Sequence, residues 1–423
     1  MKNETTDKIN NFFKTSYISP EVPKGKRIIH DTYYNDIDGD GKFGYLIIDS
    51  CYASEYYSIV DKIYQKEIQN TYTYDSINHK FHDFLYLIRK QKDQIEAKDY
   101  SNFCNRLNKK PILEFEVFHK IYGTNINLSE PLELDAFCIY NTRLHQKQLK
   151  EKMGMDFENI SEEFKNDFNS HDTWISVKVS ARECSKADEL ACIQFELFQS
   201  ICNYVLANTY SNAHINILDN RIFDVDILYT FLHGKLHGLS CTNNKMSHKL
   251  IFPSKEINIT SVICEDHKLF KEMLNIINPL SHTEISIRIK NSIVFFNRAE
   301  QEVLNSQKYI LYVMAIEALI EFDKNDIVGQ IADYISTLFS NSIDRKNAIE
   351  KEFKKIYDIR SKIIHGNQVD INHQYVHMSL CYSYDLIHLF LTDPTIKKIS
   401  KNDEFQKYIE TKKKNLLIEV KHI

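Results

Sequence analysis

The chain has 423 residues, of which 43% are hydrophobic and 26% charged, values that are ordinary for globular proteins and exclude a wholly disordered chain. Its length suggests two or three domains. The formal net charge is −5, so no overall basic charge attracts nucleic acid, and any such contact must be local. Only 10 residues are glycine, which disfavours most families with phosphate-binding glycine loops.

The nine cysteines are scattered, odd in number and never spaced as C-x-x-C. This pattern indicates reduced thiols, as in a cytoplasmic protein, instead of a disulfide framework or a zinc knuckle. The first residues, MKNETTDKINNFF, contain no apolar segment typical of a secretory signal. The longest apolar run, Tyr309–Ile320, has 12 residues, is interrupted by Glu317 and is too short to span a bilayer. We therefore expect a cytoplasmic protein without a membrane span.

Residues 1–165 are expected to form a helix-rich mixed region of unknown function. The run FGYLIID, residues Phe43–Asp49, has the length of a strand and follows a turn-prone Asp/Gly cluster. Helices are predicted around Ser54–Glu67, His79–Lys90, Leu113–Tyr122 and Leu134–Lys152. The polar segment Asp156–Asp172 is the best candidate for a linker or an exposed helix.

Residues 166–283 are expected to form a small α/β region. Apolar and polar residues alternate from Trp174 to Ser180, which predicts a half-buried strand. Apolar residues then recur at steps of three and four from Leu190 to Tyr204, which predicts an amphipathic helix. Ser185 and Asp188 have the spacing of a capping box at its start.

Residues 284–423 are expected to be helical throughout. The pattern begins at Glu284 and continues in segments with short polar connections, which favours an antiparallel bundle. The predicted helices after the first are Tyr309–Phe322, Ile327–Phe339, Asp344–His365, Asn372–Leu391 and a final helix within Lys397–Ile423. The overall fold class is therefore predicted to be α+β, mostly α.

Two partial motifs overlap near the predicted strand, formed by Gly39, Gly41 and Gly44 and by Asp36, Asp38, Asp40 and Gly41. The glycines satisfy G-x-G-x-x-G, but the strand follows them, whereas a dinucleotide site needs a strand before and a helix after. The aspartates copy the first half of an EF-hand loop, but Ile47 occupies the position of the bidentate Glu. A hairpin turn is favoured over a calcium site.

Two histidine pairs, His233 with His237 and His373 with His377, have i, i+4 spacing. Neither pair has the Glu that follows the first His in HExxH, so surface or core packing is favoured for each. A metal-dependent enzyme that uses the aspartate cluster or the first histidine pair stays open as a third hypothesis. We predict no bound metal or cofactor.

One segment combines an apolar stripe with two chemically useful side chains. In KEFKKIYDIRSKIIHGN, residues Lys351–Asn367, Arg360 and His365 lie five residues apart, which is about 140° on a regular helix. Gly366 is the residue expected at a left-handed helix stop, so His365 belongs to the last turn. A neutral His can accept the proton of a ribose 2′-OH, while Arg stabilises the charge on the phosphate oxygens. A surface charge and a capping residue are the plainer interpretation of the same pair.

The segment from about Arg288 to Asp393 resembles the HEPN superfamily, in particular its Apea-like branch. The stretches RIKNSIVFFNRAE, YVMAIEALI and FKKIYDIRSKIIHGN carry the resemblance. It implies a helical bundle that dimerises and forms a metal-independent endoribonuclease site from an R-x4-6-H motif of each protomer. It also implies a role in prokaryotic antiviral defence, abortive infection or toxin-like growth arrest, with RNA as substrate and a possible regulatory partner or antitoxin.

Under this resemblance, Arg360 and His365 are the candidate catalytic residues. Ser361 follows the Arg, where the family often has Asn, Asp or His, and is a candidate for orienting one of them. Glu317 matches a recurring acidic position that is either structural or catalytic.

Lysines surround these residues and give the segment a local charge of +3, which suits either a phosphate-contacting patch or an ordinary solvated helix face. The competing hypothesis is a non-catalytic HEPN-like module that dimerises or binds RNA together with a partner protein.

Overall fold

The computed structural model describes residues 2–22, 28–29, 33–34, 44–65, 68–153, 173–209, 215, 217, 225–232, 235–243, 257–265, 267–277, 283–320, 327–366 and 371–419. Helices outweigh strands among these residues, so the fold class α+β, mostly α, is confirmed. The predicted linker Asp156–Asp172 lies outside the described residues.

The chain divides into two compact units. Unit 1 comprises Met1–Val117, Lys178–Ala191 and Leu228–Ser240, and unit 2 comprises Phe118–Val177, Cys192–Ile227 and Cys241–Ile423. These bounds differ from the predicted domain ranges 1–165, 166–283 and 284–423, because segments distant in the sequence join each unit. The predicted boundary near residue 165 falls outside the described residues.

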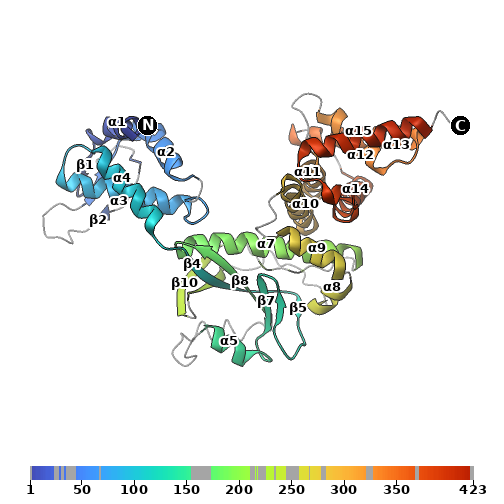
Figure 1. The fold of residues 1–423 in the computed structure, drawn as a ribbon, viewed down its shortest axis with the longest axis horizontal. Helices are drawn as coiled ribbons and strands as arrows, with labels where there is room; N and C mark the ends of the chain where they lie inside the picture. Colours follow the sequence, from blue (N-terminus) through green and yellow to red (C-terminus); the bar gives the residue numbers. More distant parts are fainter. Residues whose placement is uncertain are drawn as a thin grey trace. The chain divides into compact units, whose positions relative to one another are not determined.

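In unit 1, the described residues between 2 and 109 form four helices and a small sheet around an aromatic core (Figure 1). The helices are α1 (Lys2–Phe13), α2 (Ala53–Ile63), α3 (Tyr74–Gln91) and α4 (Ala97–Lys109), and a 3-10 turn, η1 (Ser50–Tyr52), precedes α2. The strands β1 (Tyr17–Ser19), β2 (Tyr33–Tyr34) and β3 (Gly44–Ile47) pair antiparallel in the order β1-β3-β2. Phe81 contacts Phe84 and Phe103 in the core. The predicted strand and the first two predicted helices are confirmed.

A six-stranded sheet has the order β10-β9-β4-β8-β7-β6. Its strands are β4 (Leu113–Lys120), β6 (Leu132–Leu134), β7 (Phe137–Asn141), β8 (Thr173–Ala181), β9 (Val225–Leu232) and β10 (Lys235–Asn243). Strand β7 pairs antiparallel with β8, and Ile139 lies opposite Ile175. Two short strands, β5 (Thr124–Asn125) and β11 (Ile257–Asn258), pair parallel. Strand β8 confirms the predicted strand from Trp174 to Ser180.

Two helix predictions in this part of the chain were wrong. Leu113–Tyr122 contains strand β4, and its sequence LEFEV alternates apolar and acidic residues, which is the period of a strand. Leu134–Lys152 contains strand β7 followed by helix α5 (Gln146–Met153). All five residues of β7 are buried, and such a continuous apolar run cannot be told from a buried helix by its period.

Helix α7 (Cys184–Thr209) confirms the helix predicted after β8. The predicted capping box was wrong, because the helix begins before Ser185 and the carboxylate of Asp188 accepts a hydrogen bond from the Thr230 hydroxyl. By length and composition the segment Cys184–Ala207 could cross a membrane, but 61% of its most apolar window is buried inside the protein. Such burial is typical of a core helix in a soluble protein.

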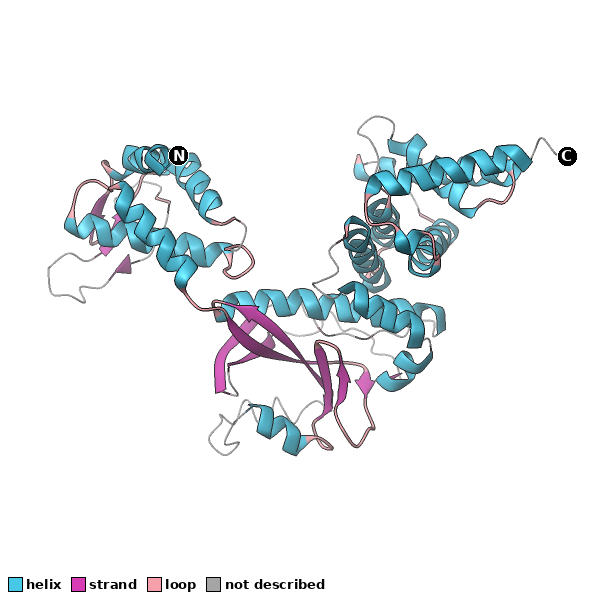
Figure 2. Ribbon diagram, in the orientation of Figure 1, coloured by secondary structure: helices cyan, strands magenta, loops and turns pink. Residues whose placement is uncertain are grey.

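Within unit 2, the part of helix α7 after Ala191 contacts both strand β7 and the C-terminal helices. Phe198 contacts Phe137 of β7, and Figure 2 shows the helix lying along the magenta strands. Toward its end, Tyr204 stacks on Tyr384 with ring centroids 4.8 Å apart. Asn203 donates a hydrogen bond to Asn297 over 2.7 Å. Two further helices, α8 (Ile259–Glu265) and α9 (His267–Ile277), lead to the bundle.

The C-terminal helices form the predicted bundle, whose HEPN-type identity stays a prediction. They are α10 (Glu284–Gln301), α11 (Asn305–Leu319), α12 (Ile327–Phe339), α13 (Ile343–Ile364), α14 (His373–Thr392) and α15 (Asn402–Glu419), with a 3-10 turn η3 (Ile396–Lys398) before α15. Helix α10 packs along α11, α12 along α13, and α11 against α14. The side chains of Thr283, Ser342 and Asn372 cap α10, α13 and α14. The predicted helices in this region are confirmed.

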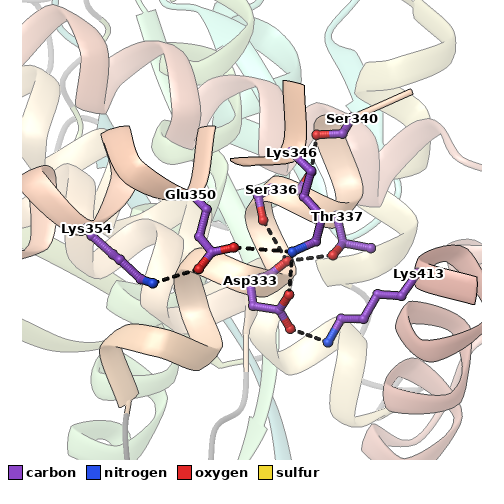
Figure 3. A network of polar contacts seen from close by, with 8 residues as sticks. All are labelled: Asp333, Ser336, Thr337, Ser340, Lys346, Glu350, Lys354 and Lys413. Carbon is purple, nitrogen blue, oxygen red and sulfur yellow. Dashed lines mark hydrogen bonds and ion pairs between the residues drawn. The ribbon is translucent and has the colours of Figure 1, made fainter. Parts of the chain in front are cut away.

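A charged network holds α12, α13 and α15 together (Figure 3). The ammonium group of Lys346 lies 2.7 Å from Asp333 and 3.3 Å from Glu350. Lys413 pairs with the other oxygen of Asp333. Burial disfavours the ionised carboxylate of Asp333, but hydrogen bonds and charges from Lys346 and Lys413 outweigh it and lower its pKa. The network therefore fixes the first half of α13 relative to two neighbouring helices.

Candidate functional site

Helix α13 carries Arg360 and Ser361, and His365 is its C-cap residue. Phe353 and Ile356 are fully buried on its inner face. The Tyr309 hydroxyl of α11 donates a hydrogen bond to the Ile356 carbonyl over 2.6 Å. The Tyr382 hydroxyl of α14 donates to Glu352 over 2.7 Å. The position of α13 is therefore defined by contacts with two neighbouring helices.

Arg360 lies on the inner side of α13 and pairs with Glu317 of α11. Its Nη2 is 3.2 Å from the Glu317 carboxylate, and its guanidinium carbon lies 5.3 Å from the centre of the Tyr357 ring. The side chains of Arg360 and Glu317 are 24% and 16% exposed. The Nε of Arg360 is buried and makes no hydrogen bond. The ion pair thus uses Nη2 of the Arg360 guanidinium, and other N–H donors of the same guanidinium are not bonded to Glu317.

Burial raises the pKa of Glu317 above its usual value of 4.5, although the charge of Arg360 and the Tyr357 hydroxyl both act to lower it. Burial and the carboxylate of Glu317 together raise the pKa of Tyr357. A carboxyl group with a raised pKa beside an Arg is a feature of many functional sites, but buried structural pairs also show it. Glu317 therefore fits a positioning role for Arg360.

Replacing Glu317 by Gln is expected to remove a pH-dependent part of the protein's stability. A carboxyl group whose pKa is raised by folding stabilises the protein most below pH 4.5, and that contribution is lost as the pH rises through the folded-state pKa. The parent's free energy of unfolding should therefore fall more than that of Glu317→Gln between pH 4.5 and neutrality. Urea unfolding at a series of pH values measures the difference.

The matched control for this measurement is Glu410→Gln, which changes an exposed glutamate of α15 in the same bundle. It should leave the pH dependence of unfolding close to that of the parent. A Glu317→Gln profile that runs parallel to the parent's, or that loses more stability than the parent toward neutral pH, would contradict the raised pKa.

His365 is the residue that ends α13, and its side chain is exposed. Its backbone N–H donates to the Ser361 carbonyl over 3.0 Å, and the Gly366 N–H donates to the Ile363 carbonyl over 3.0 Å. Gly366 has a φ of +80°, which confirms the predicted left-handed helix stop. Ser361 is half-buried and contacts His365 through its carbonyl group, so an orienting role for its hydroxyl stays a prediction.

The structure does not bring Arg360 and His365 together within one chain. Arg360 points toward Glu317, His365 is in solvent, and no hydrogen bond or ion pair joins these two described residues. Five steps of a regular helix separate two positions by about 140°, which does not bring their side chains together. A site that uses both groups on one phosphodiester therefore needs a second copy of the bundle, as the expected two-fold dimer would supply.

The lysines near these residues differ in their partners. Lys354 lies 2.6 Å from Glu350, and Lys362 lies 2.6 Å from Asp358. Lys351 and Lys355 are exposed, and the described part of the chain offers neither of them an ion pair. The predicted local positive charge is therefore partly neutralised.

Tyr357 is the site residue that sequence reasoning missed. It is 8% exposed, its ring lies against Arg360, and it affects the ionisation of Glu317. The available signal was its position three residues before Arg360, which places both side chains on the same side of a helix. Its role depends on the packing of α11, which places Glu317 beside Tyr357 and Arg360. The local sequence around Tyr357 does not reveal that packing.

The structure gives little support to the other candidate sites. The aspartate cluster and His233 lie outside the described residues, and His237 belongs to strand β10, so packing as the favoured role of that pair stays a prediction. His373 and His377 are exposed on α14, and His377 contacts Cys381 over 3.6 Å. Among the described residues no three His, Cys, Asp or Glu side chains gather as a metal site. The seven cysteines whose side chains are described are free thiols.

Comparisons of this chain with protein-family models, curated proteins and solved structures find no match. The assignment of a function therefore depends on the residues and geometry of α11 and α13.

Proposed function

We propose that this protein is a metal-independent endoribonuclease of HEPN type that acts as a homodimer. The observation that carries the proposal is the arrangement on α13, where Glu317 and Tyr357 hold Arg360 in place and His365 is exposed at the end of the same helix. An oriented guanidinium can stabilise the charge on phosphate oxygens, and a free imidazole can act as general acid or base in cleavage of an RNA backbone.

In the proposed reaction, neutral His365 of one protomer takes the proton from a ribose 2′-OH. The 2′ oxygen forms a bond to the adjacent phosphorus, and the bond from phosphorus to the 5′ oxygen breaks. The protonated histidine of the partner gives the leaving oxygen a proton. Arg360 stabilises the charge on the phosphate oxygens, through fork donors that Glu317 does not use. The products carry 2′,3′-cyclic phosphate and 5′-hydroxyl ends, and DNA is not a substrate because it lacks the 2′-OH.

The biological setting follows from the family resemblance. It suggests a cytoplasmic protein of a prokaryotic antiviral defence, abortive-infection or toxin-like growth-arrest system, controlled by a partner or antitoxin. The scattered free cysteines are consistent with a reducing compartment.

One observation favours the second candidate, a non-catalytic module that dimerises or binds RNA with a partner protein. The Arg360–Glu317 pair is mostly buried and contributes to bundle packing, so a structural role explains the arginine without chemistry. This alternative predicts RNA binding that does not depend on His365 and is not followed by cleavage.

Incubation of the purified protein with total RNA in excess EDTA tests the proposal. Cleavage should persist, and mapping of the fragment ends should find cyclic phosphates and 5′-hydroxyls. RNA that is bound but stays intact would support the module, whereas cleavage that stops in EDTA and returns with a divalent metal would overturn the metal-independent mechanism.

A further inference from the structure

One face of α13 is exposed along the whole approach to His365. Residues at i, i+4, i+7, i+11 and i+14 lie on the same face of a helix. On α13 this series is Lys351, Lys355, Asp358, Lys362 and His365, and all five side chains are exposed. At 1.5 Å of rise per residue the face is about 21 Å long. We call these five residues the α13 face.

Two carboxylates on or beside the α13 face are paired with lysines. Asp358 pairs with Lys362, and Glu350 pairs with both Lys346 and Lys354. Glu352 lies off the face and accepts the hydrogen bond of Tyr382. Neither Lys351 nor Lys355 has an ion pair with a described carboxylate, so both supply exposed positive charge.

The surface is hollowed at these two lysines. A shallow depression of about 480 Å³ follows α13 and is lined by Asn347, Glu350, Lys351, Lys354, Lys355 and Asp358. The residues that line it include three lysines and two carboxylates, and both carboxylates are paired with lysines. A positively charged groove is one of the features by which proteins follow the backbone of a single-stranded nucleic acid, and this depression presents exposed cations as far as Asp358.

We infer that the α13 face binds one strand of RNA, with successive phosphates at Lys351 and Lys355 and the strand continuing toward His365. This inference rests on the proposed function, because it supplies the path by which a phosphodiester reaches the imidazole. A single strand fits because the uncompensated charge follows one helix in one line, whereas a duplex presents two backbones.

The test measures binding without cleavage, in protein carrying His365→Ala. A fluorescently labelled oligouridine of about 12 nucleotides is titrated by anisotropy over a series of salt concentrations. Each phosphate contact contributes about −0.7 to the slope of log K against log salt concentration for a single strand. The double variant Lys351→Gln/Lys355→Gln should therefore reduce the magnitude of the slope by about 1.4 and weaken binding about 25-fold at 0.1 M salt.

The control variant is Lys407→Gln, an exposed lysine of α15 in the same bundle. It should leave the slope and the affinity unchanged. The inference is overturned if the double variant binds like its parent, if Lys407→Gln weakens binding as much, or if duplex RNA binds equally well with the same lysine dependence. Lysine-dependent binding by a protein that fails to cleave RNA would instead support the path and remove the nuclease proposal.

Discussion

His365→Ala is expected to lower the rate of RNA cleavage by about 10²–10⁴-fold, the usual contribution of a general acid or base. The same change should alter the free energy of unfolding by less than about 0.5 kcal/mol, because the side chain is exposed and the backbone hydrogen bond to Ser361 does not involve the imidazole. Cleavage rates on a labelled RNA and urea unfolding of the same preparation measure the two effects.

Arg360→Lys provides the second half of this prediction. Lysine keeps the positive charge beside Glu317 but lacks the planar fork, so it can pair with the carboxylate without presenting further oriented donors to a phosphate. Cleavage should fall by about 10²-fold or more while the fold is retained. Arg360→Ala is less informative, because it also leaves Glu317 buried without its cation.

Ser361→Ala separates the roles of neighbouring residues. Its carbonyl group still accepts the His365 N–H, so the end of α13 is preserved. The cleavage rate of Ser361→Ala is expected to fall much less than that of His365→Ala, and an equal fall would indicate a catalytic role for the Ser361 hydroxyl.

Cleavage at the parental rate by both His365→Ala and Arg360→Lys would show that neither residue is catalytic and would contradict the nuclease proposal.

Helix boundaries in the C-terminal bundle could be predicted from the sequence because their signals are local. Ser342 and Asn372 begin helices as side-chain caps, Gly366 ends α13, and periodic apolar residues fill the segments between. Strand β7 could not be predicted in the same way. Its burial on both faces depends on strands far along the chain, and its apolar run has no period that excludes a helix.

In the candidate site, too, local features could be predicted from the sequence and tertiary contacts could not. The exposure of His365 followed from its place before Gly366, and the lack of contact between His365 and Arg360 followed from helical geometry. The ion pair of Arg360 with Glu317 spans 43 residues and depends on how α11 packs against α13. The polar groups of the site could therefore be predicted from the sequence. Their partners could not, because tertiary packing determines which groups meet.

Phe353→Ala is expected to cost the bundle about 3–5 kcal/mol of stability, the usual loss for truncating a buried phenylalanine. Phe353 is fully buried on the inner face of α13, and its ring meets Tyr382 edge-on with centroids 5.8 Å apart. Its loss removes packing contacts between α13 and α14 and leaves a cavity next to the hydrogen bond from Tyr382 to Glu352. Guanidinium unfolding followed by circular dichroism measures the change.

The control for this prediction lies on the same helix. Ile364 is 49% exposed, so Ile364→Ala should change stability by no more than about 0.5 kcal/mol. If α13 is the scaffold that positions Arg360, the cleavage rate of Phe353→Ala should fall in proportion to the fraction of unfolded protein. Its cleavage should recover at a low temperature that restores the fold. His365→Ala should stay inactive even when it is folded. A stable Phe353→Ala protein, with a loss below about 1 kcal/mol, would contradict the packing of α13 on which the positions of both catalytic candidates depend.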